Sequence, residues 1–432
     1  MRLARRRLKG VREPHDVLAL LSVRAQALKV GTAAGLCGDW FGSRAVLAPA
    51  IRAVPVDDPF PMLERQPVVA GAQPGAVGGG WFAYLSYDLT DPSGRSAGLP
   101  RAVWGWADHV LRLDERGQWW FEALVPDDAP DPSAEEFEEL LGREVVREGW
   151  APTTLTRPLP HLDAIKACVH AIEAGELFQA NICTRFTGSF TGSPVDLFTE
   201  GVRTLRPRRA AFLSGDWGAV VSLSPELFLS RHGDLVRSTP IKGTRPRRGP
   251  ADDHLAQRLR ESTKDVAENV MITDLVRNDL SRVCAVGTVR VPDLLTVRPA
   301  PGVWHLESTV EGRLAPGRTD ADLLRATFPP GSVTGAPKIR ALDLIAELEP
   351  AARGVYTGAV GMVSPVAGLE LNVAIRTLEI HDGKAALGVG GGITADSDPV
   401  AEWQECLHKA APLEALLAAG IQHQLPDGTA RP

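Results

Sequence analysis

Residues 370–393 read ELNVAIRTLEIHDGKAALGVGGGI and contain the strongest strand signal in the chain. Apolar and β-branched residues run up to Asp382-Gly383 and resume directly after it. An Asp-Gly pair readily adopts the positive φ angles of a two-residue turn, so a β-hairpin is predicted here. The glycines that follow would let a ligand approach the backbone closely. They do not open a helix inside a βαβ unit, so they are not a dinucleotide-binding motif.

Helices and strands surround this hairpin in an irregular order. Apolar residues at helical spacing indicate helices over residues 162–175, 262–282, 337–350 and 399–419. Strands are indicated over residues 178–190 and 218–241, the second as a hairpin that turns at His232-Gly233-Asp234. Because no regular βαβ repeat is present, the pattern favours an α+β fold over a doubly wound parallel sheet.

Two segments rich in proline and small polar residues, 126–134 and 151–160, are typical of surface connections. We therefore expect an N-terminal region over residues 1–150, a second domain over residues 155–418 and a frayed C-terminal tail over residues 419–432.

Two short segments resemble each other. Residues 37–51 and 214–228 both contain Gly-Asp-Trp beside an apolar stretch. The similarity is either a coincidence or the trace of a duplicated sheet element.

The composition excludes several classes of function. Hydrophobic residues make up 44% and charged residues 23% of the chain, which is typical of a globular protein. The net charge of −6 gives no electrostatic footprint for nucleic acid. No apolar run approaches the ~18 residues of a membrane span. Five scattered cysteines without metal-binding spacing indicate reduced thiols and a cytoplasmic location.

Paired acidic residues suggest a metal site. Asp265 and Glu268 are three residues apart on one predicted helix, and Glu402 and Glu405 are three apart on another. Residues at this spacing share a helix face, and two facing helices could offer carboxylates to a hard cation such as Mg²⁺. The spacing alone leaves open that they are ordinary solvated residues.

Lys242 lies in the basic, turn-rich segment TPIKGTRPR (239–247). A lysine in such a loop can act as a nucleophile, if its pKa is lowered, or as an anion clamp. The alternative is a solvated basic loop. The segment PPGSVTGAPK (329–338) is a second candidate for binding an anion through its backbone, but it lacks the ending of a phosphate-binding P-loop.

From about residue 160 to 415 the chain resembles the chorismate-utilising enzymes, which include anthranilate, aminodeoxychorismate, isochorismate and salicylate synthases. The matching segments are SPELFL, PIKGTRPRRG, KDVAENVMITDLVRNDLSRV, PPGSVTGAPK, YTGAVG, NVAIRT, GVGGGITADSDP and EWQECLHKA, and GGGWFAYLSYDL in the N-terminal region also fits. The resemblance implies a two-layer sandwich of large antiparallel sheets covered by helices, with a deep central site. Residues 155–418 would then be the chorismate-binding catalytic domain.

The resemblance also implies a role for each acidic residue and for the residues that bind chorismate. Glu268 and Glu405 match the principal Mg²⁺ ligands, and Asp265 and Glu402 match accessory acidic positions. The positions that match substrate-binding residues are Tyr356, Arg376, Lys409, Gly390, Gly391, Gly392, Thr244 and Ser332. Glu226 matches the general acid that protonates the departing 4-hydroxyl group, and His305 matches a histidine near the pyruvyl side of the ring.

Two further positions distinguish members of the family. Gln179 stands where isochorismate and salicylate synthases have a water-activating lysine, so an amine nucleophile is implied. Lys242 stands where anthranilate synthases usually have alanine, and lysine is typical of aminodeoxychorismate synthases, in which it resembles a covalent nucleophile. The implied reaction is amination of chorismate with ammonia from a separate glutamine amidotransferase subunit, and anthranilate synthase component I is the alternative.

Overall fold

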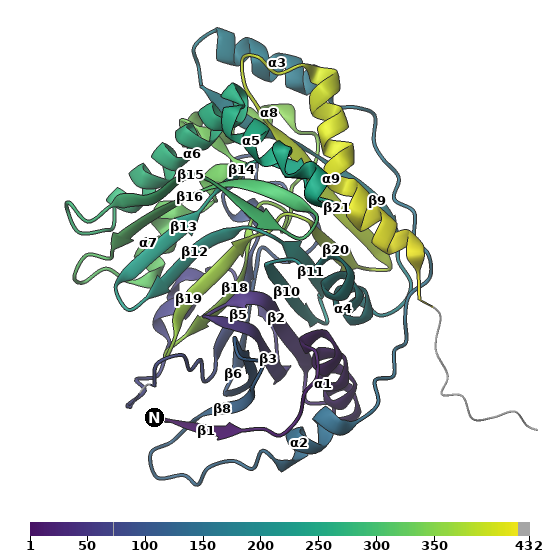
Figure 1. Ribbon diagram of the computed structural model, residues 1–432, viewed down its shortest axis with the longest axis vertical. Helices are drawn as coiled ribbons and strands as arrows, with labels where there is room; N and C mark the ends of the chain where they lie inside the picture. The colour runs from purple at the N-terminus through teal and green to yellow at the C-terminus, as the bar shows by residue number, and fades with distance from the viewer. Residues whose placement is uncertain (72, 422–432) are drawn as a thin grey trace, which may run out of the picture.

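The protein is built on two large antiparallel β-sheets covered by helices, as Figure 1 shows. The computed structural model describes residues 1–71 and 73–421, so most of the predicted frayed tail lies outside the described residues. The architecture confirms the predicted α+β class and the sandwich of antiparallel sheets.

The first sheet has eleven strands and begins with the N-terminal strand of the chain. Its strands, in spatial order, are β1 (Arg2–Arg7), β8 (Trp119–Val125), β7 (His109–Asp114), β3 (Ser43–Ile51), β2 (Thr32–Trp40), β10 (Arg209–Gly215), β11 (Gly218–Ser224), β20 (Thr377–His381), β21 (Lys384–Ile393), β9 (Gln179–Ser189) and β17 (Gly335–Ala336).

The second sheet has ten strands and packs against the first. Its strands, in spatial order, are β14 (Ile241–Pro246), β16 (Val303–Arg313), β13 (Leu235–Thr239), β12 (Leu227–His232), β19 (Gly368–Val373), β18 (Ala359–Ser364), β5 (Gly80–Leu85), β6 (Ala102–Ala107) and β4 (Val54–Pro55), with β15 (Arg290–Ala300) paired to β16.

Three of the five hydrophobic clusters in the described part of the chain hold these layers together. One lies between the sheets, where residues such as Trp40 and Phe82 are fully buried. A second lies between the first sheet and the helices α1 (Pro14–Leu28), α2 (Glu135–Gly142), α4 (Pro194–Leu205) and α9 (Pro399–Ala419). A third lies between the second sheet and the helices α6 (Thr263–Ser281) and α7 (Asp320–Thr327). The remaining helices are α3 (Leu162–Glu173), α5 (His254–Glu261) and α8 (Lys338–Leu348).

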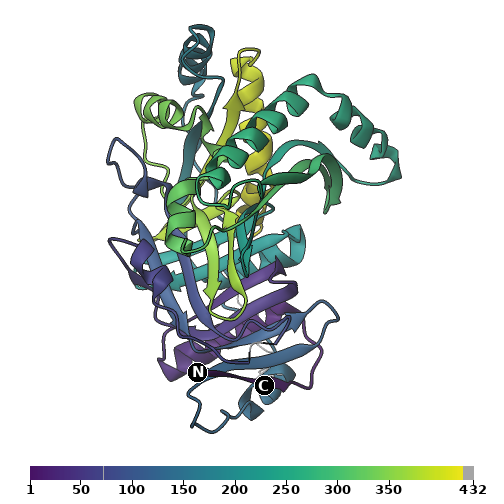
Figure 2. The same ribbon diagram turned by 90° about the vertical axis from the view of Figure 1, so that its left-hand side faces the viewer.

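The two halves of the chain repeat one order of elements. The N-terminal half runs β1, α1, β2 to β8 and α2, and the C-terminal half runs β9, α4, β10 to β12, β18 to β21 and α9. In the first sheet both series meet at the antiparallel pair of β2 and β10, and in the second sheet they meet at β5 and β18. Figure 2 shows the purple and blue N-terminal half below the green and yellow C-terminal half.

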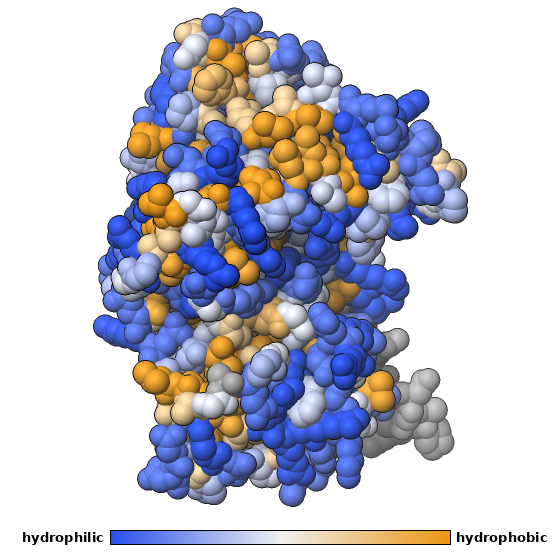
Figure 3. All heavy atoms as spheres, turned by 60° about the vertical axis from the view of Figure 1, so that its left-hand side comes forward, coloured by the Kyte–Doolittle hydropathy of each residue, from blue (hydrophilic) through white to orange (hydrophobic). Residues whose placement is uncertain are grey.

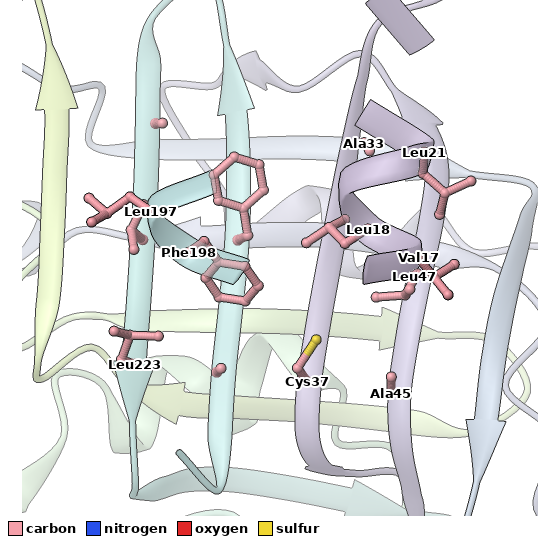
Figure 4. Close-up of a cluster of buried hydrophobic side chains, with 14 of the residues drawn as sticks. Val17, Leu18, Leu21, Ala33, Cys37, Ala45, Leu47, Leu197, Phe198 and Leu223 are labelled. Carbon is pink, nitrogen blue, oxygen red and sulfur yellow. The ribbon is translucent and has the colours of Figure 1, made fainter. Parts of the chain in front are cut away.

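Side-chain packing follows the same repeat. In Figure 4, Leu18 and Leu21 of α1 cover the hairpin of β2 and β3, while Leu197 and Phe198 of α4 lie over Leu223 and the strands beside it. The Gly-Asp-Trp segments noted in the sequence lie at the turns of these two hairpins. The similarity therefore belongs to equivalent positions of the repeated architecture.

The structure corrects two strand predictions. Within the segment 218–241, β12 and β13 form the predicted hairpin at His232-Gly233-Asp234. Strand β11 does not belong to it, because β11 lies in the first sheet and β12 and β13 lie in the second. Likewise β19 lies in the second sheet, and only β20 and β21 form the predicted hairpin around Asp382-Gly383. Both faces of these strands are buried, so the apolar pattern runs on without marking where the chain changes sheet.

The boundary predicted near residue 150 falls between α2 and α3 and stays a prediction, because both sheets combine strands from either side of it. All five cysteines lie in the described part of the chain, where they are buried and free. Among the described residues, no helix is long and apolar enough to cross a membrane. Hydrophilic residues cover most of the face shown in Figure 3, with hydrophobic residues in separate patches.

Candidate active site

The glycine-rich strand β21 forms the centre of the candidate site. A side chain at Gly388 would overlap the ring of Tyr356, with a Cβ only 2.2 Å from the nearest ring atom. A Cβ at Gly392 would stand 2.1 Å from Gln179 Nε2 and 3.3 Å from Lys242 Nζ. At Gly391, which faces the other side of the strand, the nearest atom is Glu402 Oε2 at 3.1 Å. The glycines of β21 therefore let Tyr356, Gln179 and Lys242 approach one face of the strand and Glu402 the other face.

Lys409 reaches the same strand from α9. Its Nζ donates a hydrogen bond to the carbonyl oxygen of Gly390 over 2.9 Å and pairs with Glu405 at 2.7 Å. Burial opposes the charge of Lys409, but the Glu405 carboxylate outweighs it and raises the pKa of the lysine. The lysine is therefore a stable cation next to the glycines.

Two predicted residues lie where the chain crosses between the sheets. Glu226 is in the crossing from β11 to β12, and Arg376 is in the crossing from β19 to β20. The crossings are hydrogen-bonded to each other through the backbone. The N–H of Leu223 donates to the carbonyl oxygen of Arg376 over 3.0 Å, and that of Val373 donates to the carbonyl oxygen of Glu226 over 3.1 Å. The sheet topology thus places the backbone of Glu226 and the backbone of Arg376 in neighbouring crossings.

Glu226 has the properties of a general acid. It is buried, and loss of hydration raises the pKa of its carboxyl group to about 7 despite a hydrogen bond from Ser332 and the nearby charge of Lys242. The backbone N–H of Ile241 also lies 3.4 Å from its Oε1. A carboxyl group with this pKa is partly protonated at neutral pH and can donate a proton.

Lys242 lies among charged groups of both signs. Burial lowers the pKa of its ammonium group, the Glu268 carboxylate counteracts this effect, and the Lys409 charge adds to it. Glu226 and Glu405 also act on its charge. A lysine with a lowered pKa carries more of the neutral amine that a nucleophile requires.

Arg376 and His305 lie close enough for the arginine charge to act on the histidine. Burial lowers the pKa of the Arg376 guanidinium, and within the described residues no side chain is paired with it. The backbone φ angle of Arg376 is +50°, which is uncommon for a residue other than glycine. Burial, with the charges of Arg376 and Arg208, lowers the pKa of His305 to about 3, so its ring is neutral. Thr244 Oγ1 lies 3.0 Å from His305 Nδ1.

Each of the four acidic residues lies close to a cation. Asp265 pairs with Arg245 at 2.6 Å, and Glu405 pairs with Lys409. Glu402 and Glu268 share Lys264, whose Nζ lies 2.9 Å and 3.9 Å from their carboxylates. Burial raises the pKa of Glu268, with Lys242 and Lys264 acting against the rise and Glu405 adding to it. Within the described ranges, no group of three or more His, Cys, Asp or Glu side chains is close enough to hold a metal ion.

Comparison with known proteins identifies the family. The family described as "chorismate binding enzyme" matches this chain over residues 53–415. The chain belongs to this family.

Chorismate-binding enzymes of two kinds are among its relatives. Aminodeoxychorismate synthase component 1 of Klebsiella aerogenes is 46% identical over 248 residues, which cover 57% of this chain and 54% of that protein. The aligned part thus spans about half the length of that relative. Anthranilate synthase component 1 of Streptomyces coelicolor is 37% identical over 369 residues, covering 77% of this chain and 71% of that protein.

A solved structure supports the same assignment. Anthranilate synthase component I from Streptococcus pneumoniae superposes with a TM-score of 0.70 and 28% identity, covering 83% of this chain and 86% of that one. The comparisons establish a chorismate-utilising enzyme and leave the product to be argued from the site.

The magnesium ion that the family implies can be tested against the donor set. The Lys264 ammonium stands between the carboxylates of Glu268 and Glu402, which come from two different helices. The molecule therefore already directs two buried carboxylates at one cation. Mg²⁺ commonly takes one or two protein carboxylates and completes its shell with water and substrate oxygens, so these residues fit it.

Sequence reasoning missed the support beneath this candidate site. The Lys338 ammonium pairs with Asp279 at 2.5 Å and donates to the carbonyl oxygens of Thr327 and Pro329, each over 3.0 Å. These bonds fix the turn that carries Ser332, and Glu226, Ser332 and Asp279 line one small cavity. The segment PPGSVTGAPK is therefore held by its own lysine. The sequence signal for this support is a lysine shortly after a glycine-rich turn, at the start of a helix.

Proposed function

We propose that the protein is component I of an aminodeoxychorismate synthase, which aminates chorismate at C4 to give 4-amino-4-deoxychorismate. One observation carries the proposal: Lys242, the residue typical of this branch of the family, has its amine beside Gly392 and Gln179 and close to the charges of Glu226 and Glu268. Relatives named aminodeoxychorismate synthase component 1 support the assignment.

The chemistry follows from Glu226 and Lys242. The protonated Glu226 carboxyl gives its proton to the 4-hydroxyl group, which leaves as water while the neutral Lys242 amine forms a bond to C2 of the ring. Ammonia then forms a bond at C4, and the C2–N bond to Lys242 breaks. The proton that ammonia loses restores the acid, so the net change is one hydroxyl exchanged for one amino group, with the enolpyruvyl group retained.

Gln179 favours ammonia over water as the nucleophile. Its side chain is 1% exposed, and its Oε1 is buried without a hydrogen-bond partner among the described residues. An amide has no base with which to activate water, but its oxygen can accept a hydrogen bond from ammonia. We therefore assign Gln179 to positioning the nucleophile.

The anionic groups of chorismate require cations and N–H donors once they leave water. We assign the carboxylates of chorismate to four groups: the Arg376 guanidinium, the Lys409 ammonium, the Tyr356 hydroxyl and the backbone at Gly390 to Gly392. Thr244 and Ser332 are assigned to the polar lining of the site. The neutral His305 is assigned to the pyruvyl side of the ring. Glu268 and Glu405, with Asp265 and Glu402, would hold Mg²⁺, which neutralises the charge of the ring carboxylate.

The name component 1, borne by the relatives, supports a second component that releases ammonia from glutamine. We propose such an amidotransferase as the partner, and a cytoplasmic location in keeping with the free cysteines. The N-terminal region over residues 1–150 then contributes strands to both sheets and supports the site from outside.

Incubation with chorismate, Mg²⁺ and an ammonium salt, followed by mass analysis, tests the proposal. Conversion of chorismate to an aminated compound that keeps its enolpyruvyl group supports it. Formation of anthranilate and pyruvate would overturn it in favour of anthranilate synthase component I, the name borne by the second kind of relative.

A further inference from the structure

Lys264 occupies an unusual place between the two helices that carry the predicted metal ligands. It lies in the first turn of α6, one helical turn before Glu268. Its Nζ lies 2.9 Å from Glu402 Oε1 on α9 and 3.9 Å from Glu268 Oε1 on its own helix. One ammonium group thus bridges both helices.

This bridge is a charged one. The side chains of Glu402 and Glu268 are 4% and 11% exposed, and that of Lys264 is 44% exposed. The Nζ of Lys264 donates a hydrogen bond to Glu402 Oε1 over 2.9 Å, and a lysine is a cation at neutral pH. Ser397 Oγ donates a further hydrogen bond to the same Glu402 oxygen over 2.7 Å, which fixes the carboxylate in this position.

We propose that Lys264 is an internal competitor of Mg²⁺, which keeps the affinity of the free enzyme for the ion low until chorismate binds. The proposal rests on the magnesium site of the proposed function. It concerns the order in which Mg²⁺ and chorismate bind, and it does not depend on which product is formed.

The physical reason is electrostatic. A cation that binds Glu268 and Glu402 must either displace the Lys264 ammonium or share the carboxylates with it, and both disfavour binding. A chorismate carboxylate brings negative charge to the site and contributes an oxygen to the ion. Mg²⁺ and chorismate should therefore bind cooperatively, each raising the affinity for the other by the same factor.

Replacing Lys264 with methionine removes the competitor while keeping a side chain of similar length. We expect Lys264→Met to bind Mg²⁺ about tenfold to a hundredfold more tightly than the wild type in the absence of chorismate. Isothermal titration of each protein with MgCl₂, repeated with chorismate present, measures both the affinity and the coupling. The coupling factor should be smaller in the variant than in the wild type.

Two control variants define the effect. Lys264→Arg keeps the charge and should retain the wild-type affinity, and Lys9→Met removes an exposed lysine from the N-terminal half and should change nothing. If Lys264→Met does not fold, Lys264→Gln carries the same test. Magnesium affinity equal to or below that of the wild type in the neutral variant that folds would overturn the competitor role. A wild type that binds no Mg²⁺ even with chorismate would instead overturn the magnesium site.

Discussion

The two halves of the molecule share one order of strands and helices, but only the C-terminal half contains candidate catalytic residues. The clearest difference is between β8 and β21, which hold equivalent places in the first sheet. Strand β8 reads WWFEALV and is almost fully buried, whereas β21 ends in GVGGGI. Bulky side chains fill the N-terminal position, and glycines leave the C-terminal one open to Gln179, Lys242 and Tyr356. The candidate site thus lies where glycines in β21 replace the bulky side chains that β8 has at the equivalent place in the sheet.

A second difference is the segment inserted between corresponding strands. Between β4 and β5 the N-terminal half has residues 56–79, while between β12 and β18 the C-terminal half has residues 233–358. This longer segment supplies Lys242, Glu268, His305 and Ser332. The repeated strands contribute Glu226 and Arg376 at the two places where the chain crosses between the sheets. The site is therefore assembled from an inserted segment and the two crossings, together with β9, β21 and α9.

The largest expected effect is that of Lys242→Ala. If the Lys242 amine forms the covalent bond at C2, its removal should lower the amination rate by on the order of 10³-fold or more. Binding of chorismate should change little, since Arg376 and Lys409 remain. Steady-state rates and direct binding of chorismate measure the two quantities separately. Turnover within a fewfold of the wild type would exclude a covalent role for Lys242.

Glu226→Gln should reduce kcat by roughly 10²-fold or more, because the 4-hydroxyl group then leaves without a proton. The pKa of Glu226 is raised to about 7, and the acid must be protonated to act. In the wild type kcat should therefore fall as the pH rises above about 7, and this limb should disappear in the variant. A pH–rate profile of each protein checks the assignment, and a wild-type rate that is unchanged between pH 6 and pH 9 would contradict it.

The contrast between the halves explains what could be predicted from the sequence. The hairpin around Asp382-Gly383, the long helices and the α+β class follow from local patterns. The sheet crossings at Glu226 and Arg376 do not, because a strand buried in one sheet resembles a strand buried in the next. The resemblance named the site residues, but spacing could not show that Lys264 stands between Glu268 and Glu402, since α9 begins more than a hundred residues after α6.

The N-terminal half has a buried charged group of its own, which should affect stability and not catalysis. Glu122 on β8 pairs with Arg112 at 2.8 Å and accepts the backbone N–H groups of Val77 and Gly78 over 2.7 Å and 3.0 Å. Glu122→Gln leaves a buried guanidinium without its counter-charge, at a cost of about 3–5 kcal/mol in the free energy of unfolding. Denaturant titration measures the loss, and kcat under native conditions should stay near the wild-type value. A large fall in kcat without loss of stability would show that the N-terminal half takes part in catalysis and contradict the prediction.

Ser332→Ala should have the smallest effect and the most specific one. The hydrogen bond from Ser332 stabilises the ionised form of Glu226 and so lowers the pKa of its carboxyl group. A hydrogen bond to a charged group is worth about 1.5–3 kcal/mol, and 1.36 kcal/mol corresponds to one pKa unit, so its loss should move the pKa upward by about one to two units. The falling limb of the pH–rate profile should then lie at higher pH than in the wild type, with the Michaelis constant for chorismate changed little. A limb that moves to lower pH would mean that Ser332 holds the protonated acid, and the inserted turn would then stabilise the proton donor itself.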